Sequence, residues 1–318
     1  MLCVVVAGVL AIHSAPGHAQ DYPNRPIRLL VGFLPGASTD IFARMLATEL
    51  QKAWGQSVVV ENKGGANGII ATTDLAKAAP DGYTLMFTLS SHVTNALYYK
   101  KLPYDIASDF TPVTMTMRTP WMLIAAPTFP AGNVREVIAL AKAKPGDITF
   151  GSAGEGSTPH LTMEMMNLMA GIKMTHVPYK GSSQAMVDLI SGRLSLLFST
   201  VPLAQTFLAQ NRVKAIAISS PTRMKALPDV PTVAESGVPG FEADIWFGII
   251  GPARMPPAVT SKIQSEVARI LAKPEVIASL AAQSAEAVGT SPDAFSEFLK
   301  ADLAKWKKIF SEAGIPTQ

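Results

Sequence analysis

Short apolar runs alternate with helix-patterned segments along this chain, and that alternation limits the possible folds more than any other feature. In the first third, strands are expected at 27–31, 58–60 and 84–88, and helices at 39–54 and 68–78. Strands separated by helices of this length form right-handed βαβ units in a mainly parallel sheet. A second series of the same kind occupies residues 122–218, and amphipathic helices follow to the end. We therefore expect an α/β protein with two similar domains.

Composition favours a well-packed protein and disfavours a nucleic-acid partner. Hydrophobic residues make up 48% of the 318 residues and charged residues only 16%, which is ample for the cores of two domains. The net charge is +3, and no block of Lys and Arg is present that could neutralise a row of phosphates. We expect no nucleic acid among the partners.

The N-terminal segment has the pattern of a signal peptide. An apolar run at residues 2–12 is followed by small and polar residues that end in Gly17-His18-Ala19. About eleven apolar residues match a signal-peptide core and are too few to span a bilayer as a helix. We expect residues 1–19 to be a signal peptide and the mature protein to be periplasmic; a buried first strand is the alternative.

Cysteine usage agrees with an exported protein that does not depend on disulfides. The only cysteine is Cys3, which lies inside the expected signal peptide. The mature chain would therefore contain neither a disulfide nor a cysteine metal site.

Two segments, 29–40 and 148–161, combine a strand, a loop rich in glycine and serine, and the start of a helix. Ligands of open α/β sheets bind at such loops, beyond the carboxyl ends of the strands. The free N–H groups of the helix start favour an anion, and glycine allows close backbone approach. Neither loop contains the G-x-x-x-x-G-K-[ST] pattern of a phosphate loop. If the two loops face each other across a cleft, they can clamp one carboxylate between them.

Several motifs in these segments and elsewhere are recognisable as a set. They are YPNRPIRL at 22–29, PGASTD at 35–40, VENK at 60–63, PDGYTL at 80–85, KLPYD at 101–105, FGSAGEGS at 150–157, HVPYKG at 176–181 and LPDVPT at 227–232. With these motifs the chain resembles the substrate-binding proteins of tripartite tricarboxylate transporters, the Bug family of periplasmic solute receptors. The motifs extend over essentially the whole mature chain.

The resemblance implies a two-domain periplasmic binding protein type II-like fold with a ligand cleft between the domains. The chain is expected to pass from the first domain to the second and back, so that domain 1 comprises residues 20–121 plus 242–318 and domain 2 residues 122–241. The implied function is that of a non-catalytic, monomeric receptor. It would deliver a small organic carboxylate to the membrane subunits of the transporter without a cofactor.

In such receptors the two loops hold the carboxylate mainly through backbone N–H groups and ordered waters. Carried over to this chain, the implied ligand-binding residues of the loops are Phe33, Pro35, Gly36, Ala37, Ser38, Asp40, Ser152, Ala153, Gly154, Gly156, Ser157 and His160. Ala37 stands where the family commonly has a second glycine. Candidates for selectivity deeper in the cleft are Ser90, Ser91, His92, Asn95, Tyr179, Lys180, Gly181, Ser182, Ser183 and Asp188.

Two acidic side chains near the expected anion need an explanation. Asp188 opposes a carboxylate unless it meets a hydroxyl or an amine of the ligand, so a purely structural role is equally open. Glu155 must point away from the anion, or else the ligand is not a simple carboxylate.

Other interpretations of the same residues are weaker. Trp121, Met122 and Trp246 are expected to pack at the crossovers between the domains rather than to contact ligand. The methionines of 163–169 fit core packing better than a copper(I) site. An exported hydrolase that uses a serine and His160 of the 151–160 loop is the alternative function, although the G-x-S-x-G pattern is absent.

Overall fold

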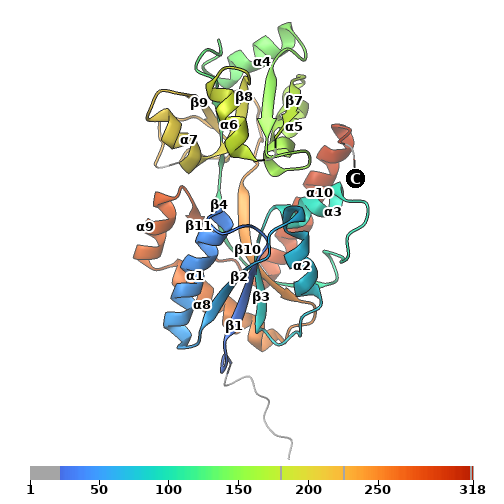
Figure 1. Cartoon of the computed structure of the whole chain (residues 1–318), viewed down its shortest axis with the longest axis vertical. Helices are drawn as coiled ribbons and strands as arrows, with labels where there is room; N and C mark the ends of the chain where they lie inside the picture. Colours follow the sequence, from blue (N-terminus) through green and yellow to red (C-terminus); the bar gives the residue numbers. More distant parts are fainter. Residues whose placement is uncertain (1–21, 180, 225, 316, 318) are drawn as a thin grey trace, which may run out of the picture.

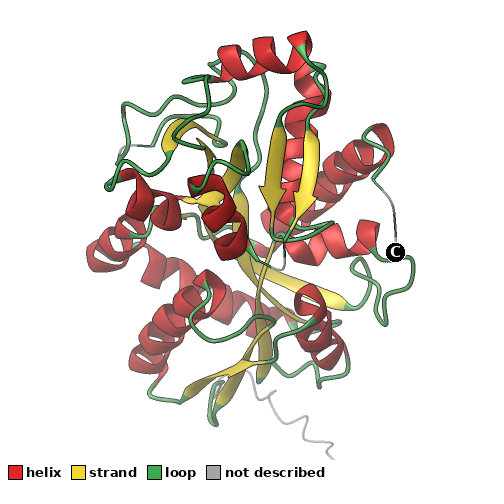
Figure 2. Ribbon diagram, turned by 45° about the horizontal axis from the view of Figure 1, so that its top comes forward, coloured by secondary structure: helices red, strands yellow, loops and turns green. Residues whose placement is uncertain are grey.

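The computed structural model describes residues 22–179, 181–224, 226–315 and 317. The expected signal peptide and Cys3 lie outside these residues. Two lobes are stacked along the long axis of the molecule, each with its own sheet and flanking helices (Figures 1 and 2). We call them the lower and the upper lobe, as they are oriented in Figure 1.

The lower lobe contains a six-stranded sheet in the order β11-β4-β10-β3-β1-β2. Its strands are β1 (Ile27–Val31), β2 (Val58–Asn62), β3 (Thr84–Leu89), β4 (Phe110–Thr119), β10 (Ile245–Pro252) and β11 (Glu286–Ala287). β1 is parallel to both β2 and β3, as the βαβ pattern predicts. The sheet as a whole is nevertheless mixed rather than mainly parallel, because β10 returns from the other lobe and runs antiparallel to β3 and β4.

The upper lobe repeats this arrangement with five strands in the order β7-β6-β8-β5-β9. They are β5 (Trp121–Ala125), β6 (Thr149–Ser152), β7 (Thr175–Pro178), β8 (Leu196–Thr200) and β9 (Lys214–Ile218). β6 is parallel to β7 and β8, whereas β5, which enters from the lower lobe, is antiparallel to β8 and β9. In both sheets the strand at the crossover interrupts the parallel order.

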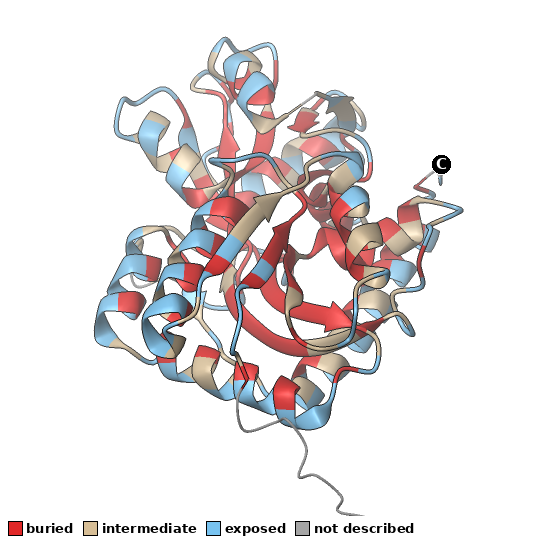
Figure 3. Cartoon of the chain, turned by 60° about the horizontal axis from the view of Figure 1, so that its bottom comes forward, coloured by how far each residue is buried: buried red, intermediate tan, exposed pale blue. Residues whose placement is uncertain are grey.

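Helices cover both sheets, and the sides of these helices that point away from the sheets are exposed (Figure 3). Those of the lower lobe are α1 (Ser38–Trp54), η2 (Ala66–Gly68), α2 (Ile69–Ala76), α3 (Ser91–Tyr98), α8 (Pro257–Leu271), α9 (Pro274–Ala282) and α10 (Pro292–Glu312). Those of the upper lobe are α4 (Val134–Ala143), α5 (Thr158–Ala170), α6 (Ser182–Ile190) and α7 (Val201–Leu208). Within the described residues, no helix is both long enough and apolar enough to cross a membrane.

The chain crosses between the two sheets between β4 and β5 and again just before β10. Trp121, Met122 and Trp246 are buried at these crossovers, in agreement with the predicted packing role. The Trp246 indole N–H donates a hydrogen bond to Asp302 Oδ2 of α10, at 2.9 Å. The crossovers are thus tied to the C-terminal helix, which packs against α5 of the upper lobe.

The methionine-rich segment lies on α5. Met163, Met165 and Met166 are buried in the core, whereas Met169 is 45% exposed. Their burial supports the packing interpretation.

Candidate functional site

The first Gly/Ser loop connects β1 to α1 in the lower lobe. Gly36 has a φ of +84°, which a glycine adopts without strain. Ala37 follows with a φ of −69°, which is normal for alanine. The substitution of alanine for the second glycine therefore costs nothing here, because the unusual backbone angle falls one residue earlier.

The start of α1 offers free donors. The backbone N–H groups of Ser38, Thr39 and Asp40 have no acceptor among the described residues, whereas the N–H of Ile41 already bonds the carbonyl of Ala37. Such groups carry the positive end of the helix dipole. They are the donors that an anion at this loop would use.

Asp40 stabilises this loop with its side chain. Its carboxylate accepts hydrogen bonds from the Gly36 N–H at 2.9 Å and from Asn62 Nδ2 at 2.9 Å, and it pairs with Arg44 Nε at 2.9 Å. Burial raises the pKa of Asp40, but the bonds from Arg44, Gly36 and Asn62 outweigh it and the pKa is lowered. Asn62 also donates to the carbonyl of Phe33. The Asp40 carboxylate is thus engaged within its own lobe, and only its N–H is left for a ligand.

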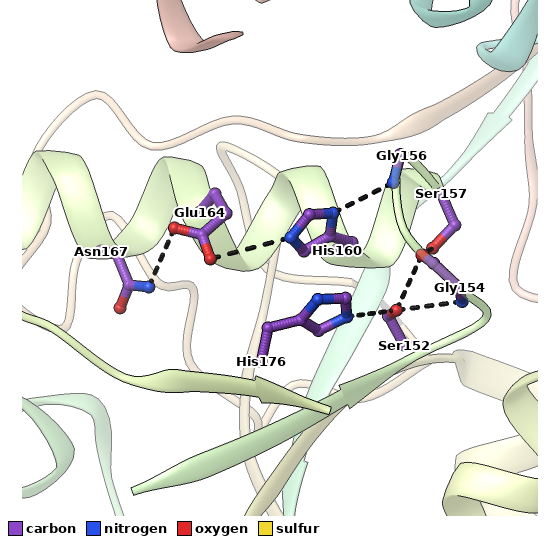
Figure 4. A network of polar contacts seen from close by, with 8 residues as sticks. All are labelled: Ser152, Gly154, Gly156, Ser157, His160, Glu164, Asn167 and His176. Atoms are coloured by element: carbon purple, nitrogen blue, oxygen red, sulfur yellow. Dashed lines mark hydrogen bonds and ion pairs between the residues drawn. The ribbon is translucent and has the colours of Figure 1, made fainter. Parts of the chain in front are cut away.

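The second Gly/Ser loop connects β6 to α5 in the upper lobe (Figure 4). Ser152 Oγ donates to the carbonyl of Gly154 at 2.9 Å and accepts from the Gly154 N–H at 3.0 Å. Ser157 Oγ donates to the same carbonyl at 2.6 Å. His176 Nε2 lies 2.7 Å from Ser152 Oγ, and which of the two atoms donates depends on the tautomer of the imidazole. The two serine hydroxyls shape the loop.

Four backbone donors of this loop remain unpaired. The N–H groups of Ala153, Glu155, Thr158 and His160 have no acceptor in the part of the chain that the structure describes. The Gly156 N–H, in contrast, is bonded to His160 Nδ1 at 3.1 Å. This loop therefore carries the same kind of donor set as the start of α1.

Two stacked imidazoles support the loop from below. The rings of His160 and His176 lie 3.8 Å apart and nearly parallel, and Phe150 stacks on the His176 ring. Burial, together with the neighbouring His176, lowers the pKa of His160 to about 3, and burial lowers the pKa of His176 to about 4. Burial raises the pKa of Glu164, whose Oε1 lies 3.8 Å from His160 Nε2. Both histidines are therefore neutral at neutral pH.

This geometry does not form a hydrolytic site. The Ser152 side chain is fully buried and directs its proton to a carbonyl. Ser157 likewise donates to Gly154, and His160 Nδ1 is occupied by the Gly156 N–H. Although Ser152 Oγ lies 2.7 Å from His176 Nε2, its burial keeps it from a substrate, and Ser157 has no imidazole partner among the described residues.

Two of the polar residues that follow β3, Ser91 and Asn95, are held by Asn67 of η2, which the sequence did not single out. Asn95 and Asn67 form a reciprocal pair: Asn67 Nδ2 donates to Asn95 Oδ1 at 2.8 Å, and Asn95 Nδ2 donates to the Asn67 carbonyl at 3.0 Å. Ser91 Oγ donates to the same carbonyl at 3.4 Å. Ser90 is buried and accepts the backbone N–H of Trp246 at 3.1 Å. The hydroxyl of Ser90 thus fixes a crossover strand.

Asp188 is paired within the upper lobe. It accepts the Tyr179 hydroxyl at 2.8 Å and Arg193 at 2.5 Å. The hydrogen bond from Tyr179 and, to a smaller extent, the one from Arg193 lower the pKa of the Asp188 carboxyl. Burial and, after it, the hydrogen bond to Asp188 raise the pKa of the Tyr179 hydroxyl to about 12. These contacts give Asp188 a structural role in the upper lobe, and its contact with a ligand stays a prediction. Gly181 precedes α6 as its N-cap, and Lys180 lies outside the described residues.

Two cavities lie between the lobes. A small one of about 30 Å³ is lined by residues of both lobes, none of them charged: Ser38, Phe42, Thr119, Thr200, Pro202, Ile245, Phe247 and Gln283. It includes Ser38 of the first loop, together with residues that the sequence did not indicate. A larger one of about 450 Å³ lies between α5 and α10 and contains none of the predicted site residues. No cluster of three His, Cys, Asp or Glu among the described residues is arranged to hold a metal ion.

Comparisons with known proteins agree with the two-lobed fold. The sequence model of the family described as "Tripartite tricarboxylate transporter family receptor" matches residues 42–315. Protein BugT of Bordetella pertussis is 35% identical over 313 residues, covering 98% of this chain and 95% of that protein.

Solved structures are similar over the same length. Rpa4515 of R. palustris, determined with adipate, is 35% identical with a TM-score of 0.84, and the match covers 94% of this chain and 100% of that one. MatC (Rpa3494) of Rhodopseudomonas palustris, with bound malate, is 29% identical with a TM-score of 0.77. The match covers 91% of this chain and 99% of that one. The similarity therefore extends through both lobes.

Proposed function

Because the chain belongs to the tripartite tricarboxylate transporter family of solute-binding receptors, we propose that it binds a small organic carboxylate between its lobes and passes it to the membrane subunits. It is a receptor of a periplasmic family, and the hydrolase alternative is not supported. Two relatives were solved with adipate and with malate, and both of these ligands are carboxylates.

The observation that carries the proposal is the set of unpaired N–H groups at the starts of α1 and α5. A carboxylate needs several donors directed at its two oxygens, and helix starts supply them together with a favourable dipole. No lysine or arginine is required at either loop. The proposal keeps the predicted ligand-binding residues of both loops, with the side chains of Asp40 and Ser152 shaping the loops and their backbones facing the anion.

We also propose a domain division, an export signal and an oligomeric state for this receptor. The lobes correspond to domains at 20–121 plus 242–318 and at 122–241, which is supported by the separate sheets. Residues 1–19 act as a signal peptide for export. The mature receptor acts as a monomer.

A thermal-shift screen of carboxylic acids tests the proposed ligand class. A ligand that binds only the folded state raises the apparent stability by about 2.7 kcal/mol at 100 times its Kd. Each acid is paired with its neutral amide as a matched control, and mass spectrometry checks that the ligand is released unchanged. The proposal predicts stabilisation by at least one acid and none by its amide. Equal stabilisation by the amide, or none by any acid, would refute it.

The role of the backbone donors can be tested at one position. Ser38 is the first residue of α1, where proline fits the helix, and Ala37 before it is already extended. Ser38→Pro removes the N–H and should weaken binding about 10-fold or more, since a hydrogen bond to a charged group contributes about 1.5 kcal/mol or more. Ser38→Ala removes only the hydroxyl and should bind nearly as the wild type does. Equal losses in the two variants would contradict a backbone-held anion.

A further inference from the structure

The negative side chain of the second loop, Glu155, has a partner in the opposite lobe. Tyr98 stands at the end of α3 in the lower lobe and is only 5% exposed. Burial first, and then the charge of the Glu155 carboxylate beside it, raises the pKa of the Tyr98 hydroxyl. The exposed carboxylate of Glu155 therefore lies near the Tyr98 hydroxyl.

The ring of Tyr98 also packs on the backbone of the same loop. A Cβ added to Gly156 would lie 2.6 Å from Tyr98 Cδ2 and 2.7 Å from its Cγ, so only glycine leaves room for the ring. Gly156 also has a φ of +70°, which favours glycine independently. The Gly156 N–H is bonded to His160. One peptide unit is therefore fixed by an imidazole of its own lobe and by a phenol ring of the other.

The surrounding elements hold this contact in place. α10 packs against both α3 and α5, so Tyr98 and the second loop are attached to helices that share one neighbour across the lobe boundary. Figure 1 shows α3 and α10 beside the start of the upper lobe. A change in the angle between the lobes would move Tyr98 away from Glu155 and Gly156.

We propose that Tyr98 is a positioning residue that acts from the lower lobe on the ligand loop of the upper lobe, holding Glu155 and Gly156 in place while the lobes are closed and thereby slowing ligand release. This inference rests on the proposed function. It also accounts for an acidic side chain on an anion loop, because the Glu155 carboxylate lies near Tyr98 of the opposite lobe instead of facing the ligand.

The test needs a measurement that does not depend on the ligand. The only cysteine, Cys3, can be replaced by serine, and spin labels can be placed at the exposed positions Gln51 and Gln210, one in each lobe. Pulsed electron paramagnetic resonance then measures the distance between the two labels in the absence of ligand. The distance distribution gives the fractions of closed molecules and of open molecules, in which the lobes lie further apart. Tyr98→Phe keeps the ring and removes the hydroxyl. It should raise the ratio of open to closed molecules about two- to fivefold, because the hydroxyl no longer interacts with the exposed Glu155 carboxylate.

A double-mutant cycle separates this role from general packing. Glu155→Gln should also widen the distribution, and the combination with Tyr98→Phe should widen it no further than the larger single change. Tyr99→Phe, on the adjacent residue, is the matched control and should leave the distribution unchanged. Unchanged distributions in the Tyr98→Phe variant, or additive effects of the two changes, would overturn the proposal.

Adipate dissociation provides the second readout. The rate at which adipate leaves should rise by about the same factor in Tyr98→Phe as the population ratio, with the association rate little changed. Unchanged dissociation from a variant that opens more widely would also overturn the proposal. Failure of the wild type to bind any acid in the screen would count against the proposed function alone. The label distances are measured without ligand and therefore test the Tyr98 contact independently.

Discussion

Lowering the pH from about 7 to about 5 should destabilise the protein, because all three histidines that the structure describes are kept neutral by burial. The pKa of His92 is lowered to about 4, that of His160 to about 3 and that of His176 to about 4. The unfolded chain binds a proton at each near pH 6.5, whereas the folded chain does not. Their contribution to stability is therefore complete above about pH 6.5 and is lost as the pH falls toward 4.

The magnitude follows from the number of protons taken up on unfolding. Each fully buried histidine contributes about 1.4 kcal/mol of unfolding free energy per pH unit, so His92 and His160 together contribute about 2.7. His176 is partly exposed and contributes less. Asp244 acts in the opposite sense, because burial raises its pKa to about 6 and the folded state holds a proton that the unfolded state has released. Glu164, with a raised pKa, adds to this opposition. The net loss should be about 1 to 2 kcal/mol per pH unit.

Urea denaturation followed by tryptophan fluorescence measures this loss, provided that the m-value stays constant between the two pH values. His92→Phe is the matched variant, since His92 lies against the rings of Phe110 and Tyr104, and its Nδ1 is buried without a partner among the described residues. It should reduce the pH slope by about 1.4 kcal/mol per unit. Equal unfolding free energies at the two pH values, or an unchanged slope in His92→Phe, would refute the reasoning.

Two further predictions concern the second loop and the crossover. Gly151→Val should weaken ligand binding more than Ser152→Ala, because a Cβ at Gly151 would lie 2.5 Å from Leu194 Cδ2 and 3.1 Å from Ala185 Cβ and would displace the loop backbone, whereas Ser152→Ala should lose only a few-fold in ligand affinity. Circular dichroism and calorimetry distinguish the two, and equal losses would argue against backbone donors as the main contacts. Asp302→Ala should lower the free energy of unfolding by about 2 kcal/mol, because the buried Trp246 indole N–H loses its acceptor. Asp302→Asn keeps an acceptor oxygen and should lower it less, and urea denaturation measures both variants. An equal cost would show that this hydrogen bond is not the cause.

The elements that the sequence predicted well are those specified by local pattern. β1 and the strands that follow it begin and end near turn residues, and their β-branched and apolar runs favour extended structure without reference to distant residues. α3 escaped prediction, because its first residues, Ser-His-Val-Thr-Asn, have weak helix propensity and the helix depends on packing against α10. The antiparallel insertion of β10 was also missed, since pairing across more than a hundred residues leaves no local signal.

In the candidate site, too, the features set by local sequence could be predicted and those that depend on distant residues could not. The two loops could be found because glycine, serine and a helix start occur together in the sequence. The residues that fix the loops could not, since they come from neighbouring strands. Asn62 reaches Asp40 only because β2 pairs with β1 so that Asn62 lies opposite Val31. His176 reaches Ser152 only through the register of β7 on β6.

Each of the two loops contains one carboxylate, and both are turned to structural use. Asp40 is held by Gly36, Asn62 and Arg44 within the lower lobe, and the Glu155 carboxylate lies near Tyr98 of the lower lobe. In both cases the carboxylate points away from the free backbone N–H groups, and its contacts help to fix the loop that carries these groups. In the site that we propose, the anion is selected by the geometry of the N–H groups rather than by a fixed cation. For this reason a loop without lysine can serve as half of a carboxylate clamp.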